Sequence, residues 1–265
     1  MTGLPSDARS TEVSAATPRW RAAAVIGASS GIGAALADRL VAGGTRVALV
    51  ARRGDLLEAR AAALAERFGA GRAHVVVHDV TQVDTVPSVF RRIDHDLGGL
   101  DLVVYAAGRM PRIGWDEYDT VQDRACIEVN LIGAVAWLNE AAEHFRRRGA
   151  GTIVGIGSIA GDRGRGGNPA YGASKAAFSH YLESLRHRLR SEGVTVSTIK
   201  PGFVDTPMTA GLPGLRGIVS ADRAAELILR AAARGRAVAY VPGRWRLVSL
   251  VVRAMPSALL ARLRL

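Results

Sequence analysis

Cysteine and aromatic residues are scarce in this sequence. The single cysteine, Cys126, excludes an intramolecular disulfide framework and is typical of a protein that stays in a reducing cytoplasm. Aromatic residues make up only 5% of the chain, and no basic stripe with interleaved aromatics indicates a nucleic-acid-binding surface. We expect no nucleic-acid partner, and no metal site is predicted.

Lysine is almost absent, although the formal net charge is +11. Of the 35 basic residues only Lys175 and Lys200 are lysines, and the other 33 are arginines scattered along the chain. We interpret most of them as solvated residues on helix surfaces. Attraction to anionic lipid or to phosphorylated substrates is the alternative.

Long apolar runs are also lacking. No stretch reaches the roughly 18 uninterrupted apolar residues of a membrane span. Residues 1–19 have no apolar core of the kind a secretory signal peptide needs. We expect a cytoplasmic protein with a disordered tail over residues 1–19.

The remaining sequence alternates apolar runs with longer helical patterns, which predicts a single α/β domain over residues 20–242. Its sheet should be parallel and doubly wound, of the Rossmann type, with helices on both faces. Leu102, Val103 and Val104 are continuously apolar, as expected of a strand buried on both faces. Strands are expected at 22–27, 46–51, 73–78, 100–106, 152–157, 194–200 and 237–241, and helices near 31–43, 54–68, 82–97, 116–148, 169–192 and 221–234.

A glycine-rich turn, Gly27–Gly33, follows the first predicted strand. Such a turn lets the backbone approach a pyrophosphate at the start of a helix. The second strand ends at Arg52 and Arg53, where a carboxylate would select NAD and an arginine would select NADP. Asp55 fits a helix cap better than a ribose contact. These residues predict NADP(H) as cofactor; the alternative is that both arginines only decorate a surface turn.

A tyrosine and a lysine are spaced one helical turn apart. Asn168 and Pro169 predict a helix start, which places Tyr171 in the first turn and Lys175 on the same face. A tyrosine has a reference pKa of about 10, and moving it by three units takes about 4 kcal/mol. The helix N-terminus and the ammonium both favour the phenolate, so we expect a lowered pKa and a proton-donating Tyr171. An exposed tyrosine beside a solvated lysine is the alternative.

Ser158 follows the fifth predicted strand. The carboxyl ends of strands in an open parallel sheet are where ligands bind. A hydroxyl there could hold a substrate carbonyl beside Tyr171, although a serine at such a position is by itself more often a turn residue.

Together these residues resemble the short-chain dehydrogenase/reductase family over about residues 22–242. The resemblance implies NADP(H)-dependent reduction of a carbonyl by a homo-oligomer, a dimer or tetramer. Tyr171 would protonate the carbonyl oxygen, Ser158 would stabilise it, Lys175 would hold the nicotinamide ribose, and Asn130 would anchor a relaying water. The implied cofactor contacts are Gly27, Ser29, Ser30, Gly31, Ile32, Arg52, Arg53, Asp79, Val80, Ala107, Gly108, Tyr171, Lys175, Pro201, Gly202, Val204 and Thr206.

Three positions depart from the family pattern. Ile26 stands where the family usually has threonine, and Tyr105-Ala106 where it usually has two asparagines. These positions normally brace neighbouring strands, so we expect weaker local support on the adenine side.

A narrower resemblance concerns the substrate. Residues 158–163, 200–208 and the tail from Pro242 are similar to a bacterial branch that includes keto-sugar reductases of decaprenylphosphoryl-arabinose formation. This implies a keto-sugar or lipid-linked keto-sugar. A small cyclic or nucleoside-like natural-product ketone is the alternative among enzymes. The alternative outside enzymes is a non-catalytic NADP-binding regulator, which would have lost Tyr171 or Lys175.

The segment after Thr206 is apolar and is expected to cover the substrate through Pro207, Met208, Leu212, Pro213 and Leu215. Arg112, Trp115 and Arg163 are candidates for the entrance. Residues 243–265 alternate arginines with apolar residues around Pro256 and predict two short basic amphipathic helices. We favour packing on the domain or on a partner subunit; peripheral contact with the inner face of a membrane is the alternative.

Overall fold

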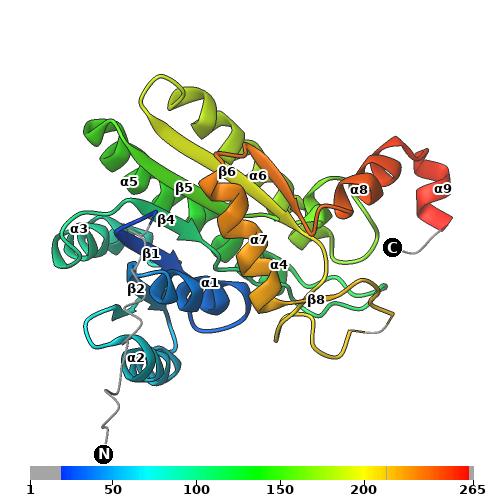
Figure 1. The fold of residues 1–265 in the computed structure, drawn as a ribbon. Coiled ribbons are helices and arrows are strands. Elements are labelled where there is room, and N and C mark those ends of the chain that lie inside the picture. The colour runs from blue at the N-terminus through cyan, green and yellow to red at the C-terminus, as the bar shows by residue number, and fades with distance from the viewer. Residues whose placement is uncertain (1–18, 213, 263–265) are drawn as a thin grey trace, which may run out of the picture.

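The computed structural model describes residues 19–212 and 214–262, and the tail expected over residues 1–19 lies, except for Arg19, outside them. Seven parallel strands form one sheet in the order β3-β2-β1-β4-β5-β6-β9 (Figure 1). The order reverses between β1 and β4, which is where open α/β sheets bind ligands. The predicted fold class is confirmed. The strands are β1 (Ala22–Ile26), β2 (Arg46–Ala51), β3 (Ala73–Val77), β4 (Leu102–Tyr105), β5 (Gly151–Ile156), β6 (Val194–Pro201) and β9 (Val238–Val241).

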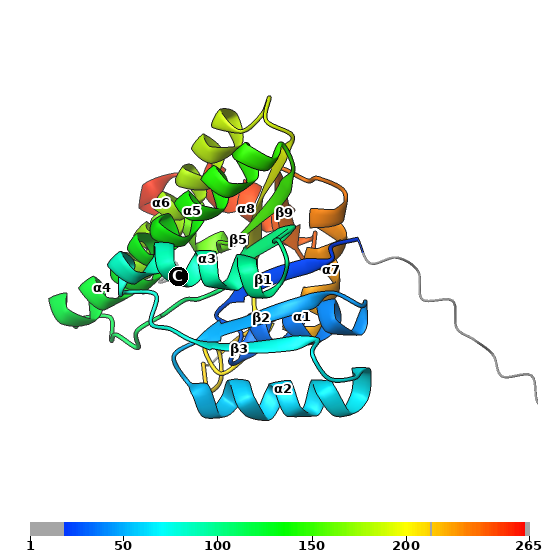
Figure 2. The same ribbon diagram turned by 90° about the vertical axis from the view of Figure 1, so that its left-hand side faces the viewer.

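Helices cover both faces of the sheet (Figure 2). Along β1, Ala22, Ala24 and Ile26 pack into one apolar layer, and Ala23 and Val25 pack into the other. This alternation buries a strand completely and explains its continuous apolar sequence. One layer holds α3 (Val86–Asp96), α5 (Gly133–Arg148) and α6 (Pro169–Arg188); the other holds α1 (Gly31–Ala42), α2 (Gly54–Phe68) and α7 (Ala221–Ala233).

The single helix expected over residues 116–148 is interrupted. It begins as α4 (Thr120–Ile127), because the Asp119 carboxylate caps the backbone N–H groups of Val121 and Gln122. A π-helical segment, η2 (Glu128–Ile132), then joins α4 to α5. Hydrophobic periodicity cannot distinguish one wide turn from the α-helix around it, so the sequence did not predict this segment.

Four further elements are short. The strands β7 (Val204–Asp205) and β8 (Val219–Ser220) form a separate two-stranded sheet that no sequence signal predicted. The 3-10 turns are η1 (Val83–Thr85) and η3 (Ile159–Gly161).

Two C-terminal helices, α8 (Trp245–Ala254) and α9 (Ser257–Arg262), project from one side of the domain (Figure 1). The Trp245 ring packs edge-on against Phe203, with 5.2 Å between ring centres. The Ser249 hydroxyl donates to the Asp162 carboxylate over 2.5 Å. Within the described residues, none of the helices has the length and apolar character needed to span a bilayer.

Candidate active site

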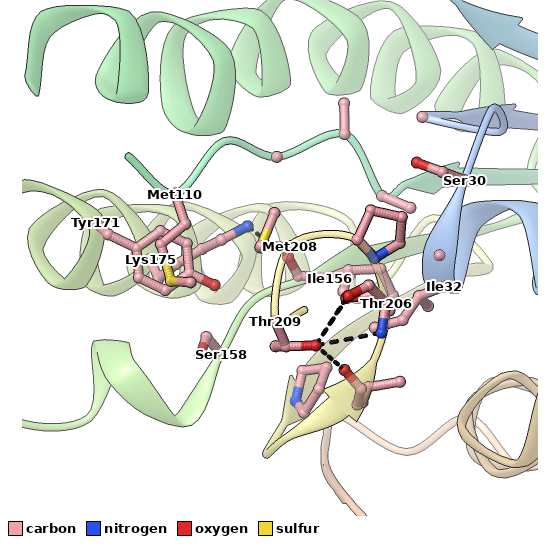
Figure 3. Close-up of a pocket in the computed structure, with 18 of the residues that line it drawn as sticks. Ser30, Ile32, Met110, Ile156, Ser158, Tyr171, Lys175, Thr206, Met208 and Thr209 are labelled. Carbon is pink, nitrogen blue, oxygen red and sulfur yellow. Dashed lines mark hydrogen bonds between the residues drawn. The ribbon is translucent and has the colours of Figure 1, made fainter. Parts of the chain in front are cut away.

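A cavity of about 360 Å³ opens at the carboxyl ends of β1, β2, β4, β5 and β6. Figure 3 shows Ser30 and Ile32 at one end of it and Tyr171, Lys175 and Met110 at the other. Every predicted cofactor contact except Asp79 lines this cavity. Of the predicted catalytic residues, Ser158, Tyr171 and Lys175 line it, whereas Asn130 does not.

The glycine turn brings two loops into direct contact. Gly27 has a φ of +96°, and a Cβ there would lie 2.5 Å from the Ala107 backbone nitrogen. A Cβ on Gly33 would overlap the Gly27 carbonyl. Only glycine fits both positions, and the start of α1 is thereby held at the cavity wall. This cradle fits the pyrophosphate of a dinucleotide.

Arginine side chains border the same end of the cavity. The Arg53 guanidinium donates to the hydroxyls of Ser29 and Ser30 over 2.8 and 2.9 Å. Arg52 lies 3.7 Å from the carboxylate of Asp79, which does not itself line the cavity. The structure thus places both arginines at the cavity edge beside the glycine turn.

The Tyr171 end of the cavity is assembled by α6 and the loop after β5. Asn168, with a φ of +54°, accepts a hydrogen bond from the Tyr171 backbone N–H over 3.3 Å and so caps the helix. Ser158 is buried, its hydroxyl accepts from the Ala160 backbone N–H over 3.1 Å, and its side chain lies next to that of Tyr171. The Lys175 ammonium is also buried, and it donates to the Ile156 carbonyl over 2.9 Å.

The direction expected for the pKa of Tyr171 is wrong for this structure. Burial raises the pKa of Tyr171, and the Ser158 hydrogen bond and the Arg165 charge only partly oppose it. The ammonium of Lys175 lies 5.9 Å from the centre of the Tyr171 ring and is directed to the Ile156 carbonyl. Burial also lowers the pKa of Lys175, to about 8. The phenol is therefore held in its protonated, proton-donating form at neutral pH.

Asn130 lies in η2 behind the cavity wall and is fully buried. Its carboxamide accepts from the Arg109 N–H over 2.7 Å and donates to the Arg109 carbonyl over 2.9 Å. It also donates to the Ser174 hydroxyl over 3.0 Å. These bonds tie the loop after β4 to α6, which carries Tyr171 and Lys175.

Tyr105 supplies a brace where weaker support was expected. Its ring is fully buried, and its hydroxyl donates to the Val129 carbonyl over 2.6 Å. The bond joins the end of β4 directly to η2. Tyr105 thus stands in place of one of the usual asparagines and links β4 to η2, the segment that carries Asn130.

The substrate side of the cavity differs in part from the sequence prediction. Pro207, Met208 and Leu212 line it as expected, Leu215 does not, and Pro213 lies outside the described residues. The proposed entrance residues Arg112, Trp115 and Arg163 do not line it. Arg112 bonds to the Ala210 carbonyl, and Arg163 donates to the Ser257 hydroxyl over 2.8 Å.

Met110 and Arg165 line the cavity instead, and sequence reasoning missed both. The only available signal for Arg165 was its place in the loop before the predicted Asn168 cap. The side chains of neighbouring loop residues cannot be assigned to inside or outside by spacing.

The open parallel sheet, the glycine turn at its switch point and the helix-borne Tyr171–Lys175 pair define an oxidoreductase of the Rossmann type that uses a nicotinamide cofactor. A family model described as short chain dehydrogenase matches residues 21–214. The chain belongs to the short-chain dehydrogenase/reductase family, whose members act on CH–OH and C=O groups.

Relatives of known sequence or structure cover most of the chain. An oxidoreductase of Myxococcus xanthus is 36% identical over 91% of this chain and 94% of its own length. A cis-4-hydroxycyclohexanecarboxylate dehydrogenase of Sinomonas cyclohexanicum is 34% identical over 83% of this chain and 88% of its own length. The structure of an actinorhodin polyketide ketoreductase variant with NADPH has a TM-score of 0.75 and 26% identity, covering 85% of this chain and 96% of that one.

Proposed function

We propose that this protein catalyses the reversible reduction of a ketone to a secondary alcohol with NADPH. The observation that carries the proposal is the meeting of Tyr171, Ser158 and Lys175 at one end of a cavity whose other end holds the glycine turn. When bound, the nicotinamide would supply the hydride that forms the new C–H bond at the carbonyl carbon. A non-catalytic regulator would have no use for a buried phenol and ammonium at this end.

The chain's own residues would manage the proton and the charge. Tyr171 gives its phenolic proton to the carbonyl oxygen as the C=O double bond is lost, and is left as a phenolate. Ser158, whose side chain lies next to that of Tyr171, stabilises the oxygen beside it. Lys175 holds the nicotinamide ribose through its ammonium. Asn130 fixes the wall formed by Gly108 and Arg109 and is proposed to anchor the water that returns the proton.

NADPH is proposed over NADH because of the charge at the opposite end of the cavity. Arg53 and Arg52 line it there, and among the described residues the only carboxylate paired with either of them is that of Asp79, with Arg52. An arginine at the end of the second strand accommodates a 2′-phosphate. The solved ketoreductase with NADPH supports the same choice.

Two substrate classes are proposed. A keto-sugar, free or lipid-linked, follows from the sequence of the substrate loops. A small cyclic ketone is favoured by the apolar lining from Met110, Phe203, Met208 and Leu212. The ring alcohol named for the Sinomonas relative and the polyketide named for the solved ketoreductase support the cyclic class. A panel of both ketone types with NADPH separates them.

The test of the chemistry is Tyr171→Phe assayed on the best ketone of that panel. Loss of the proton donor is expected to lower kcat by about 10²- to 10⁴-fold. The Kd for NADPH, measured by fluorescence, should change by less than about threefold, because the ring is retained. Turnover that survives the substitution contradicts the proposed mechanism.

We propose that the chain forms a homo-oligomer, a dimer or tetramer, whose subunit interface includes α4 and η2. Val121, Ile127 and Ile132 are exposed there although apolar. The same helix carries Asp123 and Arg124, so a second copy meets charges of both signs. Sedimentation velocity of the wild type and of Val121→Glu tests this face.

The C-terminal helices are proposed as a contact for an anionic membrane surface. The side of α8 that faces the domain holds Trp245 and Ser249, whereas Leu247, Leu250 and Val251 are turned to solvent. No acidic residue follows Glu226 in the sequence. A second copy docked on this surface would bring arginines against arginines, whereas anionic headgroups complement them. Residues 20–242 then form the catalytic domain, and residues 243–265 attach it to the inner face of a cytoplasmic membrane.

A further inference from the structure

Arg165 is a charged side chain that lines the cavity and acts on the proposed proton donor. It lies in the loop between η3 and α6 and lines the cavity together with Tyr171 and Ser158. Its charge acts on the Tyr171 phenol. The arginines that border the proposed phosphate site lie at the other end of the cavity, beside Ser29 and Ser30.

The Arg165 guanidinium is half-buried but has no hydrogen bond or ion pair to any residue that the structure describes. The nearby carboxylate of Asp162 offsets part of this charge but forms no ion pair with Arg165. One Asp162 oxygen is paired with Lys200, and the other accepts from Tyr240 over 3.0 Å and from Ser249 over 2.5 Å. The positive charge of Arg165 is therefore left facing the cavity without a partner.

The loop that carries Arg165 is held at two residues that follow it, Gly166 and Asn168. Asn168 donates from its carboxamide to the Pro111 carbonyl over 2.5 Å. Gly166 lies against the Trp115 ring so closely that an added Cβ would overlap it. These contacts fix the backbone between Arg165 and α6. The position of the guanidinium is therefore restricted by packing.

A half-buried cation without an ion-pair partner is costly, and burial lowers the pKa of Arg165 more than the charge of Asp162 raises it. A guanidinium offers a planar fork of donors that matches carboxylate and phosphate oxygens. We propose that Arg165 binds an anionic group of the substrate, a carboxylate or a phosphate, so that the preferred substrates are ketones carrying such a group. This inference rests on the proposed reductase function and narrows its substrate class.

The experiment compares ketones in pairs that differ in one anionic group. The pairs are 4-oxocyclohexanecarboxylate with its methyl ester, and dihydroxyacetone phosphate with dihydroxyacetone. The wild type is expected to prefer the anionic member of at least one pair, by about 10- to 100-fold in kcat/KM. Arg165→Gln should abolish that preference, and Arg165→Lys should restore part of it, because a lysine returns the charge without the fork. Which pair responds distinguishes a carboxylate from a phosphate.

Arg163→Gln is the matched control. Arg163 lies two residues away and bonds to the Met255 carbonyl and the Ser257 hydroxyl, outside the cavity. The Arg163→Gln substitution should leave the wild-type preference for anionic ketones unchanged. A preference equal in the wild type and in Arg165→Gln overturns the proposal.

A binding measurement separates this inference from the proposed function. Calorimetric titration with cyclohexanecarboxylate and its amide, and with glycerol 3-phosphate and glycerol, requires no turnover. Binding of an anion that depends on Arg165, without reduction of any ketone, supports the anion site and contradicts the reductase. Neutral ketones reduced as efficiently as their anionic partners, with no Arg165-dependent anion binding, support the reductase and overturn the anion site.

Discussion

Lys175 is a buried ammonium whose titration should be visible in the stability of the protein. Burial lowers its pKa from 10.5 to about 8, so between these values the unfolded chain binds more protons than the folded one. The free energy of unfolding should therefore rise with pH across this window, by at most about 3 kcal/mol. In Lys175→Met this contribution is lost. Urea unfolding of both proteins from pH 7 to 10.5 measures it, and parallel curves would contradict the burial argument.

Arg53 is the residue on which the choice of cofactor should depend most. Its guanidinium is already fixed by Ser29 and Ser30 at the cavity edge. Arg53→Gln is expected to raise the KM for NADPH by about 10- to 100-fold and that for NADH by less than about threefold. Arg60→Gln, which removes an arginine paired with Asp38 outside the cavity, is the control. Equal efficiency of NADH and NADPH in the wild type would refute the proposed selectivity.

At the scale of elements, the link between β4 and η2 decides where Asn130 lies. The Tyr105 hydroxyl makes this link to the Val129 carbonyl in a fully buried place. Tyr105→Phe should destabilise the protein by about 1–3 kcal/mol, because the carbonyl loses a partner that water cannot replace. It should also lower kcat, since η2 is freed from the strand.

Urea unfolding and steady-state kinetics measure the two effects of Tyr105→Phe. Tyr118→Phe is the control, because Tyr118 is 94% exposed and its substitution should change neither quantity. A Tyr105→Phe protein with wild-type stability would show that the bond to Val129 contributes little.

At the scale of the whole molecule, the exposed apolar side of α8 should bind anionic lipid. Wild-type protein is expected to co-sediment with phosphatidylglycerol vesicles and not with phosphatidylcholine vesicles. Val251→Glu should lower the bound fraction roughly tenfold, because it removes apolar contact and adds repulsion. Val77→Glu, at a comparably exposed valine on the opposite edge strand β3, should bind as the wild type does. Concentration-dependent self-association abolished by Val251→Glu would instead assign the surface to a second copy.

The sheet, the glycine turn and the Tyr171–Lys175 spacing were predictable because each depends on neighbours in sequence. An apolar run buried on both faces, a φ that only glycine adopts easily, and an i,i+4 pair on one helix face are properties of short segments. They account for the correct fold class and for the glycine turn and the Tyr171–Lys175 pair in the cavity wall; other lining residues, such as Ala107, Gly108, Pro201 and Thr206, were implied by the family resemblance. The same local rules predicted one long helix over residues 116–148, which is wrong. A π-helical turn does not change the hydrophobic periodicity enough to be detected.

Burial and the pairing of charges were decided by packing between distant segments. The pKa of Tyr171 is raised, not lowered, because the fold buries the phenol and directs the Lys175 ammonium to the Ile156 carbonyl. Arg165 faces the cavity while Arg163 does not, although both lie in one loop. Likewise, α8 turns Ser249 inward because Asp162 lies beneath it, which leaves the apolar residues outside. Sequence spacing determines which side chains are present and how neighbouring ones are arranged along a helix or strand. Contacts between residues far apart in the chain determine which side chains are buried and which find a hydrogen-bonding or charged partner.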